Sequence, residues 1–293
     1  MLKRLPILCA ALLALAACSQ NSGNSSAGQP STPAPAATAP AAAPAAPAST
    51  APEPTASVAP AASGSAATPA AASAPSKPAA DAVPFVDDGT WVEGKDYQRI
   101  DPVQPKLTDT DKIEVVEAFS YGCPACNAYH PTMNELVKQL PSNAVAAFLP
   151  ASFMPQENWV TLQRAYLTAQ ALGVADKAND AMYTAVWGTQ ELSAENANGN
   201  GLKPKDALPT IEDIAKVYAK FGADPKEFVG VANSFTINTK MKRADELIKA
   251  YGVEGTPTLI INGKYRVSPL SLGDPAKSIP LVKWLVAKEA AGK

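Results

Sequence analysis

Two cysteines separated by two residues lie where an apolar stretch of the chain gives way to a helical pattern. Cys123 and Cys126 belong to the segment AFSYGCPACNAYHP, residues 118–131 of the 293-residue chain. Two thiols at this spacing can serve as a redox centre, as half of a metal site, or as a structural disulfide. The elements around the pair indicate which of these chemistries the chain supports.

A helix that begins at this pair would give its two sulfurs different surroundings. The sulfur of Cys123 would lie beside unpaired backbone N–H groups at the positive end of the helix dipole, and both stabilise a thiolate. Pro124 would occupy the first helical position, where a missing N–H costs nothing. Cys126 lies most of a turn further on, close enough to bond back and more buried. We therefore expect Cys123 to be the sulfur that attacks or leaves.

The metal site and the structural disulfide find less support. A structural zinc ion takes four ligands, whereas the chain has one histidine, His130, and its other cysteines are Cys9 and Cys18 near the N-terminus. A disulfide that closes so short a loop removes little entropy from the unfolded chain. Thiol–disulfide exchange is the favoured interpretation, and the other two remain as alternatives.

The N-terminal residues resemble the signal of an exported lipoprotein. Residues 1–17 combine a basic start at Lys3 and Arg4 with a short apolar run and small residues, which is the layout of a secretory signal peptide. The run ends in LAAC, which is similar to the lipobox whose cysteine, here Cys18, is lipidated and begins the mature chain. Ordinary cleavage after the ALA of residues 14–16 is the alternative. A lipid anchor at Cys18 would hold the protein on a membrane.

Residues 18–84 consist almost entirely of Ala, Pro, Ser and Thr. Glu53, Lys77 and Asp81 are the charged side chains of this stretch, and its large apolar groups are too few to offset the entropy cost of ordering. We predict a disordered, semi-stiff tether. The remaining residues carry enough periodic apolar positions for one sizeable core. The formal net charge of −2 and the lack of a basic patch do not indicate a nucleic-acid partner.

The pattern around the cysteine pair predicts a strand, a helix and a second strand. Residues 113–119 (IEVVEAF) form a β-rich apolar run that is typical of a buried strand. Residues 124–140 have helical spacing, with Pro131 inside the helix as a kink. Residues 144–152 read as the next strand, which completes a βαβ unit.

Helical periodicity dominates residues 155–233. Asn158 and Thr210 are expected to cap two helices of this stretch, and residues 181–187 are expected to form a third. A further helix is predicted over residues 239–251, where apolar residues recur at helical spacing. This middle part of the chain is therefore expected to be an all-helical insert.

A β pattern returns near the C-terminus. The sequence TLIINGKYRV, residues 258–267, has an Asn-Gly pair between two apolar runs, which is a strong hairpin signal. The chain then ends in an amphipathic helix. The residues of this helix that we expect to be buried are Ile279, Leu281, Val282, Leu285 and Val286. The predicted order of elements is βαβ, the helical insert, then ββα.

These motifs resemble the thioredoxin superfamily and, within it, the DsbA family of periplasmic thiol:disulfide oxidoreductases. FSYGCPAC matches the DsbA-type approach to the cysteine pair, and Pro131, five residues after Cys126, matches the superfamily's helix-kinking proline. GVEGTPTLIINGKY, residues 252–265, looks like the strand and hairpin that carry a cis-proline. WVEGKDYQRI resembles the family's first strand, and a helical insert is the DsbA arrangement.

The resemblance implies an α/β thioredoxin fold (βαβ…ββα) with an inserted all-helical subdomain. Residues 85–154 and 236–293 would form the two parts of the thioredoxin fold, and residues 155–235 the insertion. A signal peptide at 1–17 and a linker at 18–84 would precede them. The insertion would separate the cysteine pair from the expected cis-proline in sequence.

Further site residues are implied by the same resemblance. Pro257 is expected to have a cis peptide bond that turns the backbone of Thr256 toward a substrate peptide; an ordinary trans proline at a strand edge is the alternative. Glu117 matches a buried acid that exchanges a proton with Cys126, unless it reaches water or a lysine at the end of its strand. His130 either tunes the thiolates or is merely packed or exposed.

The dipeptide between the cysteines departs from the family pattern. Strong oxidants of the DsbA type commonly have Pro-His there, whereas this chain has Pro124 and Ala125. A histidine at that position stabilises the reduced thiolate and makes the disulfide more oxidising. Ala125 therefore predicts a milder oxidant.

The resemblance implies a thiol:disulfide oxidoreductase that introduces disulfides into reduced, unfolded exported proteins through a Cys123–Cys126 disulfide. No metal or organic cofactor is implied, and a DsbB-like, quinone-linked membrane oxidase would re-oxidise the pair. The protein is expected to be a monomer that faces the periplasm of a Gram-negative bacterium and is anchored through Cys18. The outer membrane is favoured over the inner one because Ser19 is not an aspartate. An envelope reductase or isomerase is one alternative, and a non-catalytic peptide-binding lipoprotein is another.

Overall fold

The computed structural model describes residues 85–293. The predicted signal peptide at 1–17, the predicted lipidation site Cys18 and the predicted linker at 18–84 lie outside the described residues. Between residues 85 and 293, no helix is both long enough and apolar enough to cross a membrane.

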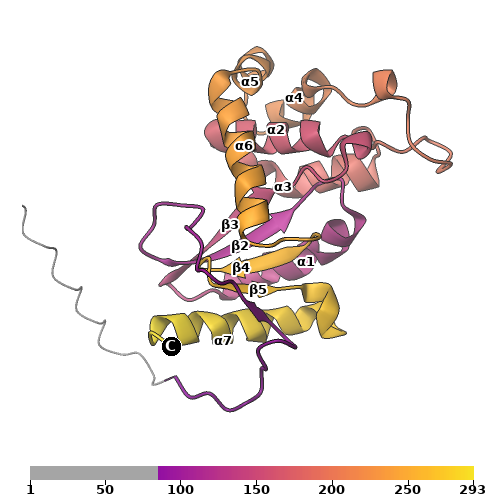
Figure 1. Ribbon diagram of the computed structural model, residues 1–293. Helices are drawn as coiled ribbons and strands as arrows, with labels where there is room; N and C mark the ends of the chain where they lie inside the picture. Colours follow the sequence, from indigo (N-terminus) through magenta and orange to yellow (C-terminus); the bar gives the residue numbers. More distant parts are fainter. Residues whose placement is uncertain (1–84) are drawn as a thin grey trace, which may run out of the picture. The chain divides into compact units, whose positions relative to one another are not determined.

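A five-stranded mixed sheet forms the centre of the fold, with the strand order β1-β5-β4-β2-β3 (Figure 1). β2 pairs in parallel with β3 and antiparallel with β4, so the N-terminal and C-terminal parts of the sheet join along β2. The strands are β1 (Gln98–Arg99), β2 (Ile113–Phe119), β3 (Ala144–Pro150), β4 (Thr258–Ile261) and β5 (Tyr265–Val267).

The connection between β4 and β5 is the predicted hairpin. Three residues, Asn262 to Lys264, connect the two strands, and Asn262 and Gly263 both have a positive φ, 54° and 66°. Asparagine and glycine are the residues that adopt this conformation most readily. On the flanking strands Ile261 lies opposite Tyr265, and Leu259 lies opposite Val267. The hairpin prediction is confirmed.

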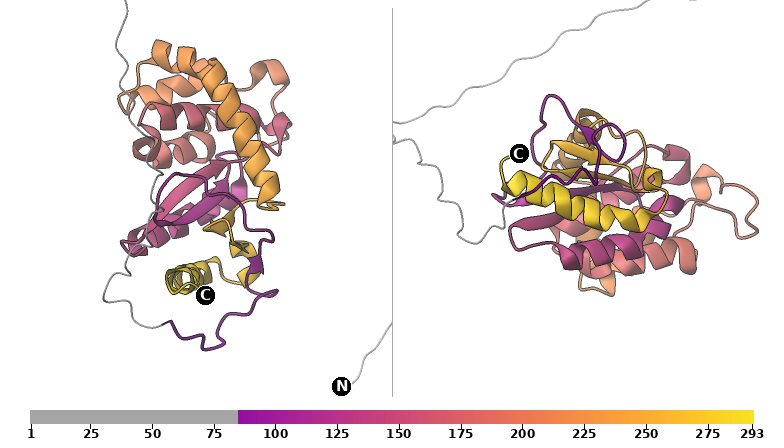
Figure 2. Two further views of the ribbon diagram at one scale, coloured as in Figure 1. Left: turned by 60° about the vertical axis from the view of Figure 1, so that its left-hand side comes forward. Right: turned by 90° about the horizontal axis from the view of Figure 1, so that it is seen from below.

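Helices α1 (Pro124–Gln139) and α7 (Ser278–Ala290) pack on one face of the sheet (Figures 1 and 2). Their buried side chains share a core with sheet residues that include Val115 and Leu259. Pro131 lies inside α1, as predicted. The expected buried residues of α7 are buried, with Ile279 only partly so: Leu281, Val282, Leu285 and Val286.

A layer of helices covers the other face of the sheet, where α2 and α6 contact β3. Val116 and Ala118 of β2 join this second core, because side chains alternate between the two faces of a strand. Burial on both faces explains the nearly unbroken apolar run of β2. The layer consists of α2 (Trp159–Ala171), α3 (Ala175–Tyr183), the π-helical η2 (Thr184–Gly188), α4 (Ile211–Ala219), α5 (Pro225–Ala232) and α6 (Phe235–Ala250).

Several helix boundaries differ from the predicted ones. The helix expected over residues 181–187 is α3 followed by η2, and it starts at Ala175. The helix expected from residue 239 starts at Phe235. Helix α5 is present in the structure, but the sequence analysis did not predict it as a separate helix. Short helical turns complete the chain at η1 (Pro155–Glu157), η3 (Lys205–Ala207), η4 (Pro269–Leu272) and η5 (Pro275–Lys277).

One of the two predicted helix caps is confirmed and the other is wrong. The Thr210 hydroxyl accepts from the backbone N–H of Asp213, and the Asp213 carboxylate accepts from the N–H of Thr210. Asn158 has a left-handed backbone with a φ of 65° and does not cap α2. Its side-chain amide instead donates to the Pro209 carbonyl at 2.8 Å. A tertiary contact has therefore replaced the local one.

Candidate active site

The first turn of α1 carries both cysteines, and the structure contains them as free thiols. Cys123 is the N-cap residue with an extended backbone (φ −87°, ψ 118°), and Pro124 follows in the first turn. The Cys123 Sγ accepts from the backbone N–H of Cys126 at 3.3 Å. The sulfur therefore takes the place that a serine or aspartate oxygen has in an ordinary N-cap.

This capping position favours the thiolate of Cys123. A hydrogen bond from the Cys126 thiol is the largest influence and lowers the pKa of Cys123 to about 6, with smaller contributions from Thr256 and from the backbone N–H groups of Cys126 and Ala125. Burial acts in the opposite direction and is outweighed. Cys123 is 5 % exposed. At neutral pH it is mainly a thiolate within reach of an incoming peptide.

Cys126 lies in the opposite electrostatic situation, although it is only three residues away. The side chain is fully buried, and burial raises its pKa far above the ordinary thiol value. Its hydrogen bond to Cys123 and the charge of Glu117 raise the pKa further. The reduced site thus holds one charged and one protonated sulfur.

Glu117 of β2 is buried beneath the pair, with 2 % of its surface exposed. Burial is the main cause, and the charge of Cys123 the second, of a pKa raised to about 8. Its Oε1 has no hydrogen-bond partner among the described residues. The expectation of a buried acid is confirmed, and the alternative of a strand-end glutamate that reaches water or a lysine is wrong. A proton-transfer role for this carboxyl stays a prediction.

The segment before β4 brings a second part of the chain to the sulfurs. The Thr256–Pro257 peptide bond is cis, as predicted. The Thr256 carbonyl oxygen lies 3.4 Å from the Cys123 Sγ and accepts its hydrogen bond. Residue 256 therefore flanks Cys123 with its main chain, as the expected peptide-binding role requires.

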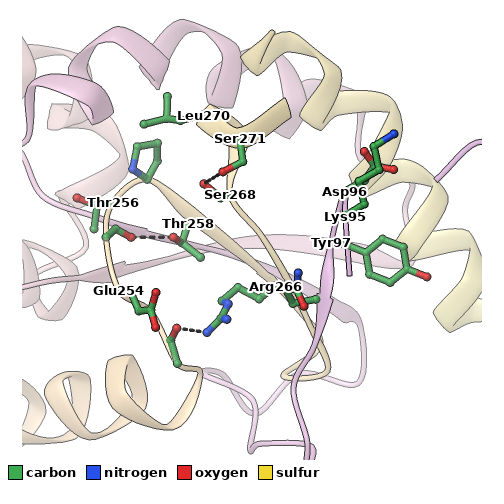
Figure 3. Close-up of a pocket in the computed structure, with 14 residues that line it drawn as sticks. Lys95, Asp96, Tyr97, Glu254, Thr256, Thr258, Arg266, Ser268, Leu270 and Ser271 are labelled. Atoms are coloured by element: carbon green, nitrogen blue, oxygen red, sulfur yellow. Dashed lines mark hydrogen bonds between the residues drawn. The ribbon is translucent and has the colours of Figure 1, made fainter. Parts of the chain in front are cut away.

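A cavity of about 330 Å³ opens beside Thr256 and Pro257, between this segment and strands β1 and β5 (Figure 3). Arg266 of β5 points into it and donates to the Gly252 carbonyl at the end of α6. Thr258 secures the loop by donating to the Gly255 carbonyl at 2.7 Å. The loop that carries the cis-proline is thus held on both sides.

His130 is turned toward the helical layer. Its Nε2 lies 2.6 Å from a carboxylate oxygen of Asp180, and its ring packs on Tyr183 with centroids 4.3 Å apart. The only other hydrogen bond of its ring within residues 85–293 joins it to Asn134. Its contacts therefore link α1 to α3, and a tuning effect on the thiolates remains a prediction.

Aromatic residues that the sequence analysis did not single out fix the backbone just before the cysteines. The Trp187 indole donates to the Tyr121 carbonyl at 2.7 Å, and the Tyr121 hydroxyl donates to Asn179 at 2.8 Å. Gly122 lies against Trp159 so closely that a Cβ on Gly122 would come within 2.7 Å of the indole Nε1. Trp187 and Trp159 are far from the motif in sequence, so no local pattern indicated them.

The chain is similar to known proteins over most of the described residues. Residues 114–280, more than half of the chain, match the family model of the DSBA-like thioredoxin domain. The thiol:disulfide interchange protein DsbA of Pseudomonas aeruginosa is 33 % identical over 201 residues, which cover 69 % of this chain and 87 % of that protein. The thiol:disulfide interchange protein DsbA of Pseudomonas syringae pv. tomato is 33 % identical over 198 residues, which cover 68 % of this chain and 84 % of that protein.

Solved structures show the same similarity. The crystal structure of P. aeruginosa DsbA superimposes with a TM-score of 0.59 at 33 % identity, covering 70 % of this chain and 97 % of that one. The oxidoreductase DsbA from Xylella fastidiosa gives the same TM-score at 28 % identity, covering 68 % and 98 %. The predicted α/β thioredoxin fold with a helical insertion is confirmed by these neighbours.

Proposed function

Because the chain belongs to the family of DSBA-like thioredoxin domain proteins, we propose that it introduces disulfide bonds into reduced exported proteins through Cys123 and Cys126. The protein is a thiol:disulfide oxidoreductase. One observation carries the assignment of roles: the pKa of Cys123 is lowered to about 6, whereas that of Cys126 is raised. Cys123 is thereby the better leaving group and the sulfur that contacts the client.

The proposed reaction starts from the oxidised pair. A client thiolate attacks the Cys123 Sγ, the Cys123–Cys126 bond breaks, and Cys126 leaves with the electron pair and takes up a proton. The second client thiolate then attacks the client's own sulfur of the mixed disulfide, and Cys123 leaves as a thiolate. The client gains one disulfide, and the enzyme has gained two electrons and one proton. The two sulfurs suffice for this exchange, so the proposal invokes no metal or organic cofactor.

Glu117 is proposed to supply that proton. A thiol whose pKa is raised by burial must be protonated as it leaves. The carboxyl of Glu117 lies near enough for its charge to raise the pKa of Cys126, and its own pKa of about 8 keeps it mostly protonated at neutral pH. It therefore has a proton to give and recovers one from water afterwards.

Thr256 and Pro257 are proposed to seat the client peptide. The Thr256 carbonyl already lies at the Cys123 sulfur, so an extended peptide joined to that sulfur would lie along the same main chain. Backbone pairing of this kind binds many sequences, since it reads no side chains. Such tolerance suits an enzyme that acts on varied unfolded proteins.

The setting of the reaction is also a proposal. We infer a periplasm-facing monomer, anchored by lipid at Cys18 to the outer membrane in preference to the inner one and re-oxidised by a quinone-linked membrane protein of the DsbB type. The lipobox-like LAAC and the family of the described residues support this setting. Mass spectrometry of the membrane fraction would detect the acyl chains on Cys18, and a soluble, unmodified mature chain would contradict the anchor.

A trapping experiment tests the function. In Cys126→Ser the mixed disulfide with Cys123 lacks its resolving thiol, so cysteine-containing exported proteins should accumulate on it. Cys123→Ser is the matched control and should trap nothing. If Cys126→Ser captured only a membrane reductase, or if the reduction potential lay near the −270 mV or so of thioredoxin, the enzyme would act as a reductase and the proposed direction would be wrong.

A further inference from the structure

A second cavity adjoins Cys123 from the helical layer. Its volume is about 190 Å³, and Gly122 and Pro124, the two neighbours of Cys123 in the chain, form part of its wall. It shares no residue with the cavity beside Thr256. A client peptide on Cys123 therefore has a pocket on each side of its cysteine.

The cavity has an apolar wall and an acidic rim. Its apolar wall consists of side chains from α2, η2 and the segment that follows them: Leu162, Val186, Trp187, Leu192 and Leu202. Glu157 and Glu195 also line the cavity, together with Ser193 and Ala194. A volume below the roughly 300–1,000 Å³ of cavities for drug-sized ligands suits a single side chain.

Both rim carboxylates lack a cationic partner. Neither Glu157 nor Glu195 takes part in an ion pair among residues 85–293, and no described group hydrogen-bonds to either side chain. Lys203 of the same segment is engaged elsewhere, because its Nζ donates to the Ser193 carbonyl at 2.7 Å. Two uncompensated negative charges thus face one small apolar cavity.

A buried donor next to the cavity also lacks a partner. Trp159 is 5 % exposed, and its indole N–H is buried and has no hydrogen-bond partner within the described residues. It lies beside the vacant side-chain position of Gly122, which lines the cavity together with Leu162. A buried N–H without an acceptor is costly, and the packing of Trp159 against Gly122 holds this donor behind the cavity wall, out of the cavity itself.

We propose that this cavity is a subsite for a lysine or arginine side chain next to the reacting cysteine of the client. The aliphatic stem would pack on the apolar wall while the cationic head meets Glu157 and Glu195 at the rim, as long basic side chains do at apolar surfaces. The inference rests on the proposed function, since the peptide is held there by its exchange with Cys123. Specificity of this kind adds to the sequence-tolerant pairing at Thr256.

Peptide kinetics test the subsite. Oxidised wild-type protein is mixed with short peptides that contain one cysteine flanked, on either side in separate series, by Lys, Arg, Gln, norleucine or Glu, and the second-order rate constant of exchange is measured by tryptophan fluorescence. In at least one series we expect Lys and Arg peptides to react about tenfold faster than Gln peptides, with norleucine in between. Equal rate constants for Lys, Gln and norleucine in both series would overturn the proposal.

Charge-neutral variants locate the effect. Glu157→Gln and Glu195→Gln should each reduce the ratio of Lys to Gln rate constants about threefold, and the double variant should bring it close to one. Glu191→Gln, an exposed neighbour that does not line the cavity, is the matched control. An equal loss in this control would assign the preference to the overall field and refute the subsite.

Two further measurements keep the outcomes separable. Glu195→Lys should reverse the preference toward the Glu peptide, a gain that a misfolded variant does not produce. Oxidation of dithiothreitol, which offers no side chain to the cavity, reports the proposed function by itself in the wild-type protein. A wild-type protein that oxidises dithiothreitol but does not discriminate among the peptides refutes only the subsite, whereas one that oxidises neither refutes the function.

Discussion

The mouth of the active site and the interior directly beneath it treat two identical thiols in opposite ways. At the mouth, Cys123 caps a helix and its pKa falls to about 6; in the interior, Cys126 is buried above Glu117 and its pKa rises. The two residues share one helical turn. The opposite pKa shifts of the two thiols therefore follow from where each side chain points: Cys123 toward backbone N–H groups and Cys126 into the core.

The largest expected difference between the two cysteines is in the reactivity of their thiols. At pH 7, Cys126→Ser leaves the thiolate at the mouth, and Cys123→Ser leaves only the buried thiol. We expect the first variant to be alkylated at least about a hundredfold faster, because thiolate fraction and access both favour Cys123. Stopped-flow alkylation with iodoacetamide of the reduced variants measures this. Comparable rates would show that the two environments are not distinct.

Removal of the interior acid should change how stability depends on pH. The pKa of Glu117 is raised to about 8 in the folded protein from an ordinary value of 4.5. Between these two pH values the carboxyl is ionised in the unfolded chain but protonated in the folded one. The free energy of unfolding therefore falls as pH rises through this range. From pH 5 to pH 8, reduced wild-type protein should lose about 3–4 kcal/mol relative to Glu117→Gln. Urea unfolding of both proteins at several pH values measures the difference. Curves that stay parallel across this range would contradict a buried, titrating carboxyl.

The ionisation of Cys123 makes the stability of the reduced protein change with pH in the opposite direction. Its pKa is lowered to about 6 from 9, so its stabilising contribution to the reduced protein is complete above the unfolded value and disappears as pH falls through 6. Thiolate absorbance at 240 nm should therefore show half-ionisation near pH 6. A midpoint above pH 8 would remove the basis for assigning the leaving sulfur.

A histidine beside Cys123 should increase the difference in pKa between the two cysteines. Ala125→His adds a donor beside Cys123, and we expect the pKa of Cys123 to fall by about one unit and the reduction potential to rise by about 30 mV. Equilibration with glutathione measures the potential, and Ala125→Gln is a control of similar size without a titratable ring. An unchanged potential would mean that the dipeptide does not set the strength of this oxidant.

The smallest effect is expected outside both environments. Asp180 is 82 % exposed and joins α3 to His130, so Asp180→Asn should cost less than about 1 kcal/mol in unfolding free energy and leave the Cys123 titration in place. Thermal unfolding and the 240 nm titration check the two parts. A shift in the Cys123 midpoint would extend the active-site electrostatics to the contact between α1 and α3.

Features with a local cause were predictable. The cysteine pair at a helix start, the βαβ unit, the Asn262-Gly263 turn and the buried face of α7 follow from spacing, turn chemistry and hydrophobic period. The buried acid Glu117 of β2 came from the family resemblance. The cis bond at Pro257 came from the family resemblance.

Features with a distant cause were not predictable. Asn158 leaves its cap for the Pro209 carbonyl, and Trp187 fixes the main chain at Tyr121, because each contact joins segments more than 50 residues apart. Local periodicity does not encode such pairs. The same holds for Asp180 and Tyr183, the partners of His130 on α3.

A helix-capping thiol and a more buried thiol three residues after it could be predicted from the amino-acid sequence, because both depend on positions within a few residues of one another. Their surroundings depend on the folded chain. It placed the Thr256 carbonyl at 3.4 Å from a sulfur 133 positions away, and it set Glu157 and Glu195 around one cavity beside Cys123. Those distances result from the packing of the helical layer against the sheet, which no local pattern contains.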